Sequence, residues 1–160
     1  MKNLMIVDMQ KGLMNKNNQH LINKINAYLK EESFDKVIYT RFYNYDESQY
    51  ENILDYKKMM TEEEIEFSVD SVENSIIFPK CSYGLPPEQL MWLREKNVKE
   101  VILCGTDIDC CILAIAFNLF DWGIKPVFKW DLCGSSNKNQ DIKESIKPLL
   151  ERNFGRDCIV

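Results

Sequence analysis

The sequence predicts a single-domain α/β fold over residues 1–160: a doubly wound, three-layer structure with a mainly parallel sheet of five or six strands. Two observations predict it. Short apolar runs alternate with stretches of helical spacing along the whole chain, which is the pattern of βαβ units. The chain also has 160 residues, 45% of them hydrophobic, with no linker or internal repeat, so it can build one packed core.

Five short runs rich in β-branched residues are expected to form the strands. Each run is continuous and apolar, as strands buried on both faces of a parallel sheet tend to be. They are residues 4–7, 37–39, 75–78, 101–104 and 126–128. Residues 158–160 follow a Gly-Arg-Asp segment and are expected to add a sixth, short strand.

Four helices are expected between these strands, because apolar side chains recur there at helical spacing. They are residues 20–31, 86–96, 109–122 and 139–152. Pro86 and Pro87 suit a first helical turn, Asp109 is expected to cap the following helix, and Gly123 is expected to end it.

Residues 43–73 show no strand pattern. They are rich in Tyr and Met and include a Thr-Glu-Glu-Glu run, so one or two short surface helices are expected. This segment is predicted to serve either as a lid over the functional site or as the interface of a homo-oligomer.

The composition excludes some classes of partner. Twenty Lys and Arg stand against 25 Asp and Glu, giving a net charge of −5, and no basic run is long enough to follow a phosphate backbone, so no nucleic acid is expected. No apolar stretch approaches the roughly 20 residues that cross a bilayer. The chain reaches Asp8 too early for a signal peptide. We therefore expect a cytoplasmic protein that inserts into no membrane.

The six cysteines are expected to be reduced thiols. Cys104, Cys110, Cys111 and Cys133 lie in or beside apolar runs, where a thiol packs as a small hydrophobic side chain. The paired C-x2–4-C spacings of a four-cysteine zinc site are absent from the sequence.

Three chemically useful side chains follow predicted strands. Asp8 ends the first strand, Lys80 the third, and Cys111 opens the helix that follows the fourth. Ligands of open parallel sheets bind where strands end, so the three are expected to meet at one edge. A helix N-terminus is expected to lower the pKa of the Cys111 thiol. Taken singly, each residue also has an ordinary interpretation: a turn cap, a solvated lysine and a core thiol.

Four segments resemble motifs of the isochorismatase-like cysteine hydrolases. Residues 7–10, Val-Asp-Met-Gln, are similar to the D-x-Q opening of that family. Residues 80–83, Lys-Cys-Ser-Tyr, resemble its catalytic lysine step. Residues 105–116 resemble its G-x-x-T-D-x-C-V-x-x-T-A signature, and residues 131–135 resemble its D-x-C-x-S segment.

The register of the signature distinguishes the two neighbouring thiols. Asp109 takes the place of the family's Asp, Cys110 its variable position and Cys111 that of the nucleophile. Ile108 and Ile115 replace the two threonines of the signature.

The resemblance implies a hydrolase of a small molecule with the triad Asp8, Lys80 and Cys111. The Cys111 thiolate would attack an sp² carbon, Asp8 would carry the proton, and Lys80 would hold Asp8 and stabilise negative charge. The bond cleaved is either an amide or carbamoyl C–N bond or an isochorismate-like vinyl ether. The resemblance also implies a cis peptide between Thr106 and Asp107, and an oxyanion hole formed by the N–H groups of Asp107 and Cys111.

No metal and no cofactor are expected. The metal-binding amidases of this family use an Asp and two His after the second strand, whereas this chain has Thr-Arg-Phe-Tyr-Asn at residues 40–44. Its single histidine, His20, is expected to cap a helix or to be solvated.

The candidates for substrate contacts are Gln10, Arg41, Phe42, Asn44 and Tyr83. Arg41 and Asn44 are expected either to bind a carboxylate or carbonyl of the substrate or to form surface ion pairs. Phe42 and Tyr83 are expected to be apolar walls of the pocket, with core or dimer packing as the alternative. Two other functions stay open: a catalytically silent binding or scaffold protein, and a thiol redox protein using Cys110 and Cys111.

Overall fold

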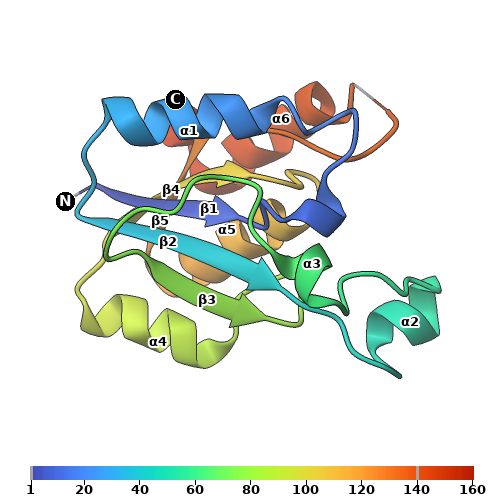
Figure 1. Ribbon diagram of the computed structural model, residues 1–160. Coiled ribbons are helices and arrows are strands. Elements are labelled where there is room, and N and C mark those ends of the chain that lie inside the picture. The colour runs from blue at the N-terminus through green and yellow to red at the C-terminus, as the bar shows by residue number, and fades with distance from the viewer. Residues whose placement is uncertain (1, 140) are drawn as a thin grey trace.

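Five parallel strands form one sheet in the order β3-β2-β1-β4-β5 in the computed structural model, which describes residues 2–139 and 141–160 (Figure 1). The strands are β1 (Asn3–Val7), β2 (Lys36–Phe42), β3 (Ile76–Lys80), β4 (Glu100–Gly105) and β5 (Lys125–Cys133). β1 lies at the centre and pairs with β2 on one side and β4 on the other. The order reverses at β1, which makes the sheet doubly wound.

Helices cover both faces of the sheet (Figure 1). They are α1 (Leu21–Glu31), α2 (Gln49–Leu54), α3 (Glu62–Ile65), α4 (Pro87–Glu95), α5 (Cys111–Asp121) and α6 (Ile142–Phe154), with short 3₁₀ helices η1 (Lys11–Leu13) and η2 (Arg156–Cys158). Among the described residues, no helix has both the length and the apolar character needed to cross a bilayer.

Alternate residues of β1 separate the core into two layers, because successive side chains of a strand point to opposite faces. Met5 and Val7 are buried against α4, α5 and α6. Leu4 and Ile6 are buried against α1 on the other face. The predicted single-domain, doubly wound α/β fold is thus confirmed, and the sheet is parallel throughout.

The five predicted strands are all present, but the predicted sixth strand is wrong. At 158–160, Cys158 ends η2, and Ile159 forms only an isolated parallel bridge to Phe128 of β5. Val160 N donates to the Phe128 carbonyl and Trp130 N to the Val160 carbonyl, but one isolated bridge does not make a strand, so the sheet has five strands. β5, in contrast, is longer than predicted: it continues to Cys133, five residues beyond its predicted end.

The predicted helices are present with shifted ends. Asp109 does not cap α5: the N-cap is Cys110, without a side-chain cap bond, and Asp109 accepts a hydrogen bond from Ser135 Oγ at 2.6 Å instead. Gly123 ends that helix as predicted, with φ +74°. The predicted helix 139–152 corresponds to α6, and residue 140 lies outside the described residues.

The segment 43–73 contains two short helices, as predicted. Ser48 caps α2 by accepting a hydrogen bond from the Glu51 N–H. Thr61 and Glu64 form a reciprocal capping box at α3. Both helices lie beyond the carboxyl ends of the strands, at the right of Figure 1. The segment therefore lies at the edge where ligands of such sheets bind.

Candidate active site

Asp8 and Lys80 form a buried ion pair at the carboxyl edge of the sheet. Asp8 directly follows β1, with φ +49°, and Lys80 is the last residue of β3. Lys80 Nζ lies 2.8 Å from Asp8 Oδ2, and both side chains are closed to solvent. Thr40 of β2 lies between the two strands and donates a hydrogen bond to Asp8 Oδ1 at 2.5 Å. Two strands that flank β2 thus deliver one carboxylate and one ammonium to the same point.

The Lys80 ammonium also contacts the Ser82 carbonyl and the Phe42 ring. Nζ donates to the Ser82 carbonyl at 2.9 Å and lies 5.2 Å from the centre of the Phe42 ring. Burial by itself lowers the pKa of Lys80, but the Asp8 carboxylate and Cys111 outweigh it, so the pKa is raised. Lys80 is therefore charged at neutral pH.

Cys111 is the first residue of α5 and follows a sharply bent loop. The peptide bond between Thr106 and Asp107 is cis, which confirms the expectation from the resemblance. Gly105 before it has φ +111°, and a Cβ at this position would lie 2.3 Å from the Val7 carbonyl oxygen. Only glycine permits this close approach of β4 to the end of β1, which places Cys111 beside Asp8.

The pKa of the Cys111 thiol is raised well above its ordinary value, contrary to the lowering expected at a helix N-terminus. Burial is the main cause and the Asp8 carboxylate adds to it, while Lys80 opposes both. The resting thiol is therefore protonated, and a thiolate forms only if a neighbouring base accepts the proton. The Asp8 carboxylate is a neighbour of the thiol.

Two backbone N–H groups, one in the loop before α5 and one at the first residue of α5, have no acceptor among the described residues. In the part of the chain that the structure describes, neither Asp107 N nor Cys111 N donates a hydrogen bond, although Ile108 N bonds to the Gly134 carbonyl and Ile112 N to the Asp107 carbonyl. Donors of this kind are available to an oxyanion.

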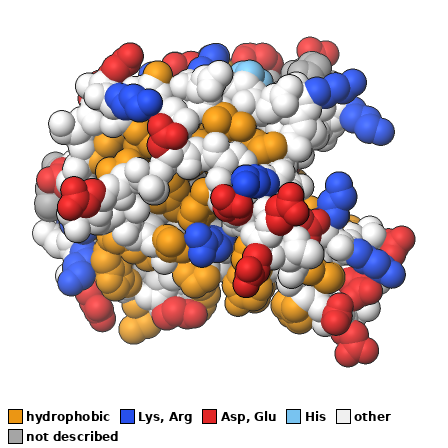
Figure 2. Space-filling view, viewed as in Figure 1, with side chains coloured by type: hydrophobic (Ala, Val, Ile, Leu, Met, Phe, Trp, Pro, Cys, Tyr) orange, Lys and Arg blue, Asp and Glu red, His pale blue; other side chains and the backbone are white. Residues whose placement is uncertain are grey.

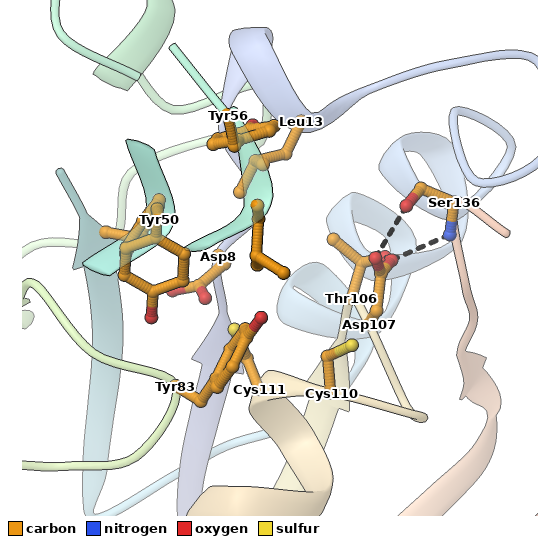
Figure 3. Close-up of a pocket in the computed structure, with 12 residues that line it drawn as sticks. Asp8, Leu13, Tyr50, Tyr56, Tyr83, Thr106, Asp107, Cys110, Cys111 and Ser136 are labelled. Atoms are coloured by element: carbon orange, nitrogen blue, oxygen red, sulfur yellow. Dashed lines mark hydrogen bonds between the residues drawn. The ribbon is translucent and has the colours of Figure 1, made fainter. Parts of the chain in front are cut away.

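A cavity of about 180 Å³ opens over these groups. Its lining is mainly apolar and aromatic. It comes from the ends of β1 and β2, from η1, from the segment 43–73, from the loops after β3 and β5, and from the loop that leads into α5. The lining residues are Asp8, Leu13, Phe42, Tyr50, Leu54, Tyr56, Tyr83, Thr106, Asp107, Cys110, Cys111 and Ser136. In Figure 3 Asp8 and Cys111 lie at its floor, with Tyr50 and Tyr83 on one side. Figure 2 shows the surface hollowed between α2 and the loop that follows β5.

The Asp107 carboxylate is held at the wall by the loop after β5. Oδ1 accepts a hydrogen bond from Ser136 N at 2.7 Å and Oδ2 accepts one from Ser136 Oγ at 2.5 Å (Figure 3). The Thr106 hydroxyl also donates to Oδ1. Burial raises the pKa of Asp107, while the hydrogen bonds from Ser136 and Thr106 oppose that rise.

Of the five predicted substrate contacts, Phe42 and Tyr83 line the cavity and the other three do not. Gln10 is fully buried: Nε2 donates to the Phe42 and Ile65 carbonyls at 2.8 and 3.0 Å, and Oε1 accepts from Phe42 N at 2.8 Å. It connects the end of β1 to the segment 43–73.

Asn44 and Arg41 are also occupied elsewhere. Asn44 donates to the Tyr56 carbonyl at 2.9 Å and accepts from Ser48 Oγ at 2.5 Å. The Arg41 guanidinium stacks over the Phe67 ring at 4.5 Å. Thr40 and Phe42, its neighbours on β2, face the site, so Arg41 points to the opposite face.

Sequence reasoning missed several lining residues: Leu13, Tyr50, Leu54, Tyr56, Cys110 and Ser136. Tyr50, Leu54 and Tyr56 belong to the segment 43–73, whose composition favoured a lid or an interface. Ser136 directly follows residues 131–135, the segment that resembles D-x-C-x-S. That position next to a motif was the only signal for it.

The described residues offer no cluster of side chains suited to a metal ion. Within residues 2–139 and 141–160, no three His, Cys, Asp or Glu side chains group closely enough to hold a metal ion. His20 is exposed at the N-cap of α1, without a side-chain cap bond.

Comparisons with known proteins agree with this architecture. A family model described as the isochorismatase domain matches residues 2–152. Similar solved structures include the pyrazinamidase of Pyrococcus horikoshii in complex with zinc, at 20% identity and a TM-score of 0.80, with 96% of each chain covered. No match was found among curated protein sequences.

Two further structures are similar over nearly their full length. The N-carbamoylsarcosine amidase of Thermoplasma acidophilum is 16% identical with a TM-score of 0.77, covering 97% of this chain and 94% of that one. The nicotinamidase of Bacillus subtilis is 16% identical with a TM-score of 0.78, covering 99% and 98%. At these identities the similarity to solved structures shows a shared fold.

Proposed function

The chain belongs to the isochorismatase family, and from that premise we propose that it is a hydrolase that cleaves a C–N bond of a small amide or carbamoyl compound with Cys111 as nucleophile. The observation that carries the proposal is the meeting of three groups at one cavity: the Cys111 thiol, the buried Asp8–Lys80 pair and two unbonded N–H groups. The amidases among the similar structures favour a C–N bond over a vinyl ether.

The first step moves one proton and forms one bond. Asp8 Oδ2 has no hydrogen-bond donor among the described residues apart from its ion pair with Lys80, so it is free to accept the thiol proton. The Cys111 sulfur then attacks the carbonyl carbon. The negative charge that develops on the carbonyl oxygen is stabilised by the N–H groups of Asp107 and Cys111.

The second step returns the proton. Protonated Asp8 donates it to the leaving nitrogen, the C–N bond breaks, and an acyl group remains on Cys111 as a thioester. A water molecule, deprotonated by Asp8, then attacks the thioester and releases the acid, and the proton on Asp8 returns to the sulfur. Lys80 stays charged throughout and holds Asp8 in position.

The experiment is a screen of small amides that measures ammonia release by the parent protein and by Cys111→Ala. We expect one or more amides to be cleaved by the parent alone, and intact-mass spectrometry during turnover to detect an acyl adduct on Cys111. Equal ammonia release by the parent and by Cys111→Ala would exclude Cys111 as the nucleophile.

A further inference from the structure

One wall of the cavity is built from aromatic rings. Phe42 and Tyr50 pack edge to face with centroids 5.0 Å apart, and Tyr50 and Tyr83 do the same at 5.2 Å. Tyr56 also lines the cavity, beside Leu13 in Figure 3. Aromatic faces attract organic cations and give no comparable attraction to anions.

A carboxylate stands on the other side of the cavity. Asp107 lies across from Tyr50 and Tyr83 in Figure 3, held by Ser136. Its three hydrogen-bond donors are neutral groups, so no cation offsets its charge there. Asp8, the other acidic residue of the lining, is already neutralised by Lys80 at 2.8 Å.

No counter-charge for an anionic ligand is present in the lining. Among the described residues that line the cavity, none is basic. Lys80 lies behind Asp8 with its side chain fully closed to solvent. Arg41 of β2 stacks on Phe67 and points away from the cavity. A carboxylate brought into the cavity would lose its hydration beside Asp107 without gaining a partner.

Resting on the proposed function, we propose that the substrate is a small amide whose non-reacting end carries a positive charge, and that Asp107 with the aromatic wall selects it. Dicarboxylates and N-carbamoyl amino acids, which carry negative charge at that end, are rejected by the same groups.

The experiment measures the reaction of Cys111 with thiol reagents that differ in charge. Methyl methanethiosulfonate is neutral, its 2-(trimethylammonium)ethyl analogue is cationic and its 2-sulfonatoethyl analogue is anionic. In each case the thiolate attacks the sulfenyl sulfur, a mixed disulfide forms and methanesulfinate leaves. Tandem mass spectrometry separates modification of Cys111 from that of the exposed Cys110, and each rate is divided by the rate with a free, uncharged thiol.

We expect Cys111 to react about tenfold faster with the cationic than with the anionic reagent after this correction. Asp107→Asn should bring the ratio of the cationic to the anionic rate, each divided by the variant's own rate with the neutral reagent, close to one. Asp131→Asn removes the same charge from β5, where Asp131 pairs with Lys129 at 2.9 Å, and should leave the ratio unchanged.

A second variant covers the case in which Asp107→Asn disturbs the loop and slows the neutral reagent too. Tyr83 is 43% exposed, so Tyr83→Leu should destabilise the fold little. This variant should lower the rate of Cys111 with the cationic reagent several-fold relative to the rate with the neutral reagent. The 2-aminoethyl analogue carries a primary ammonium, which can donate hydrogen bonds, whereas the trimethylammonium group cannot. A faster reaction of Cys111 with either cation than with the anionic reagent supports the proposal.

The outcomes separate the two proposals. Two results would overturn the charge preference and leave the hydrolase proposal standing: Cys111 reacts equally fast with the cationic and anionic reagents, or it reacts faster with the anionic one. A Cys111 that reacts with none of the reagents, together with amide turnover that survives Cys111→Ala, would overturn both.

Discussion

Lys80 Nζ lies 2.8 Å from Asp8 Oδ2 in a site where both side chains are closed to solvent. Taking two charges out of water is costly, and a buried pair repays that cost only when geometry and additional hydrogen bonds are good. The bonds from Thr40 to Asp8 and from Lys80 to the Ser82 carbonyl provide this support. Such a pair is poorly explained by stability alone, and a role in proton transfer gives a reason for it.

The first prediction is a double-mutant cycle on this pair. Lys80→Met and Asp8→Asn each leave one partner alone, and the charge left behind by Lys80→Met is expected to lower the free energy of unfolding by about 3–5 kcal/mol. The double variant, which removes both charges, should be more stable than Lys80→Met. Turnover should be lost in all three. Urea unfolding and ammonia release measure the two effects, and strictly additive losses of stability would contradict the coupling.

The second prediction separates the adjacent thiols. Cys111→Ala is expected to lower turnover by about 10⁴-fold or more, because the attacking atom is gone. Cys110→Ala should keep most of it, because the exposed Cys110 thiol takes no part in the proton path. Circular dichroism should show both variants folded. The reverse pattern would mean that the register assigned to the two cysteines is wrong.

The third prediction concerns Gln10, whose side chain makes three hydrogen bonds to the backbone of Phe42 and Ile65. Gln10→Ala is expected to lower the free energy of unfolding by about 1–3 kcal/mol, because it leaves buried backbone groups unpaired. KM should rise more than kcat falls, since Phe42 lines the cavity. Proteolysis within 43–73 should also become faster.

Gln89 provides the matched control for that variant. It is also buried, but among the described residues its side chain makes a single hydrogen bond, from Nε2 to the Pro79 carbonyl at 2.6 Å. Gln89→Ala should therefore cost less stability and leave cleavage within 43–73 unchanged. A KM that stays constant in Gln10→Ala would show that the segment is held by other contacts.

The strands were predictable because a parallel strand needs a continuous apolar run, and each run here is local in the sequence. Ile159 shows where an apolar run fails to predict a strand. Its run is apolar, but η2 ends directly before it, and Ile159 forms a single bridge, to Phe128. Asp109 failed as a helix cap for a similar reason, because Ser135, 26 residues away, takes its side chain. Both outcomes depend on tertiary contacts that a local pattern does not contain.

The meeting of Asp8, Lys80 and Cys111 at one edge was predictable from strand ends, since the carboxyl ends of parallel strands share an edge. The walls of the cavity were not. Tyr50 and Tyr56 have no periodic pattern around them, and Arg41 pairs with Phe67, 26 residues further along the chain. Their positions depend on the path that residues 43–73 take across the molecule. That path is set by the Gln10 hydrogen bonds and by the places where the strands end.

The fourth prediction is a loss of stability at alkaline pH that depends on Cys133. Cys133 on β5 is 1% exposed, and burial raises the pKa of its thiol to about 12. In the unfolded chain the thiol titrates near its ordinary value of about 8.5. Between these two values the unfolded chain has released the proton and the folded chain has kept it. The stabilisation is therefore complete below about pH 8.5, is lost as pH rises toward 12, and falls by about 1.4 kcal/mol per pH unit in between.

Cys133→Ala removes this titration, so urea unfolding between pH 8 and pH 11 should show a slope shallower by that amount than in the parent. Val127→Ala is the matched control, because it also removes buried volume from β5 but no titratable group. It should lower stability equally at every pH and keep the parental slope, whose remainder comes from other buried groups such as Cys104. Identical slopes in the parent and in Cys133→Ala would mean that the thiol reaches water before the molecule unfolds as a whole, through a local opening of β5.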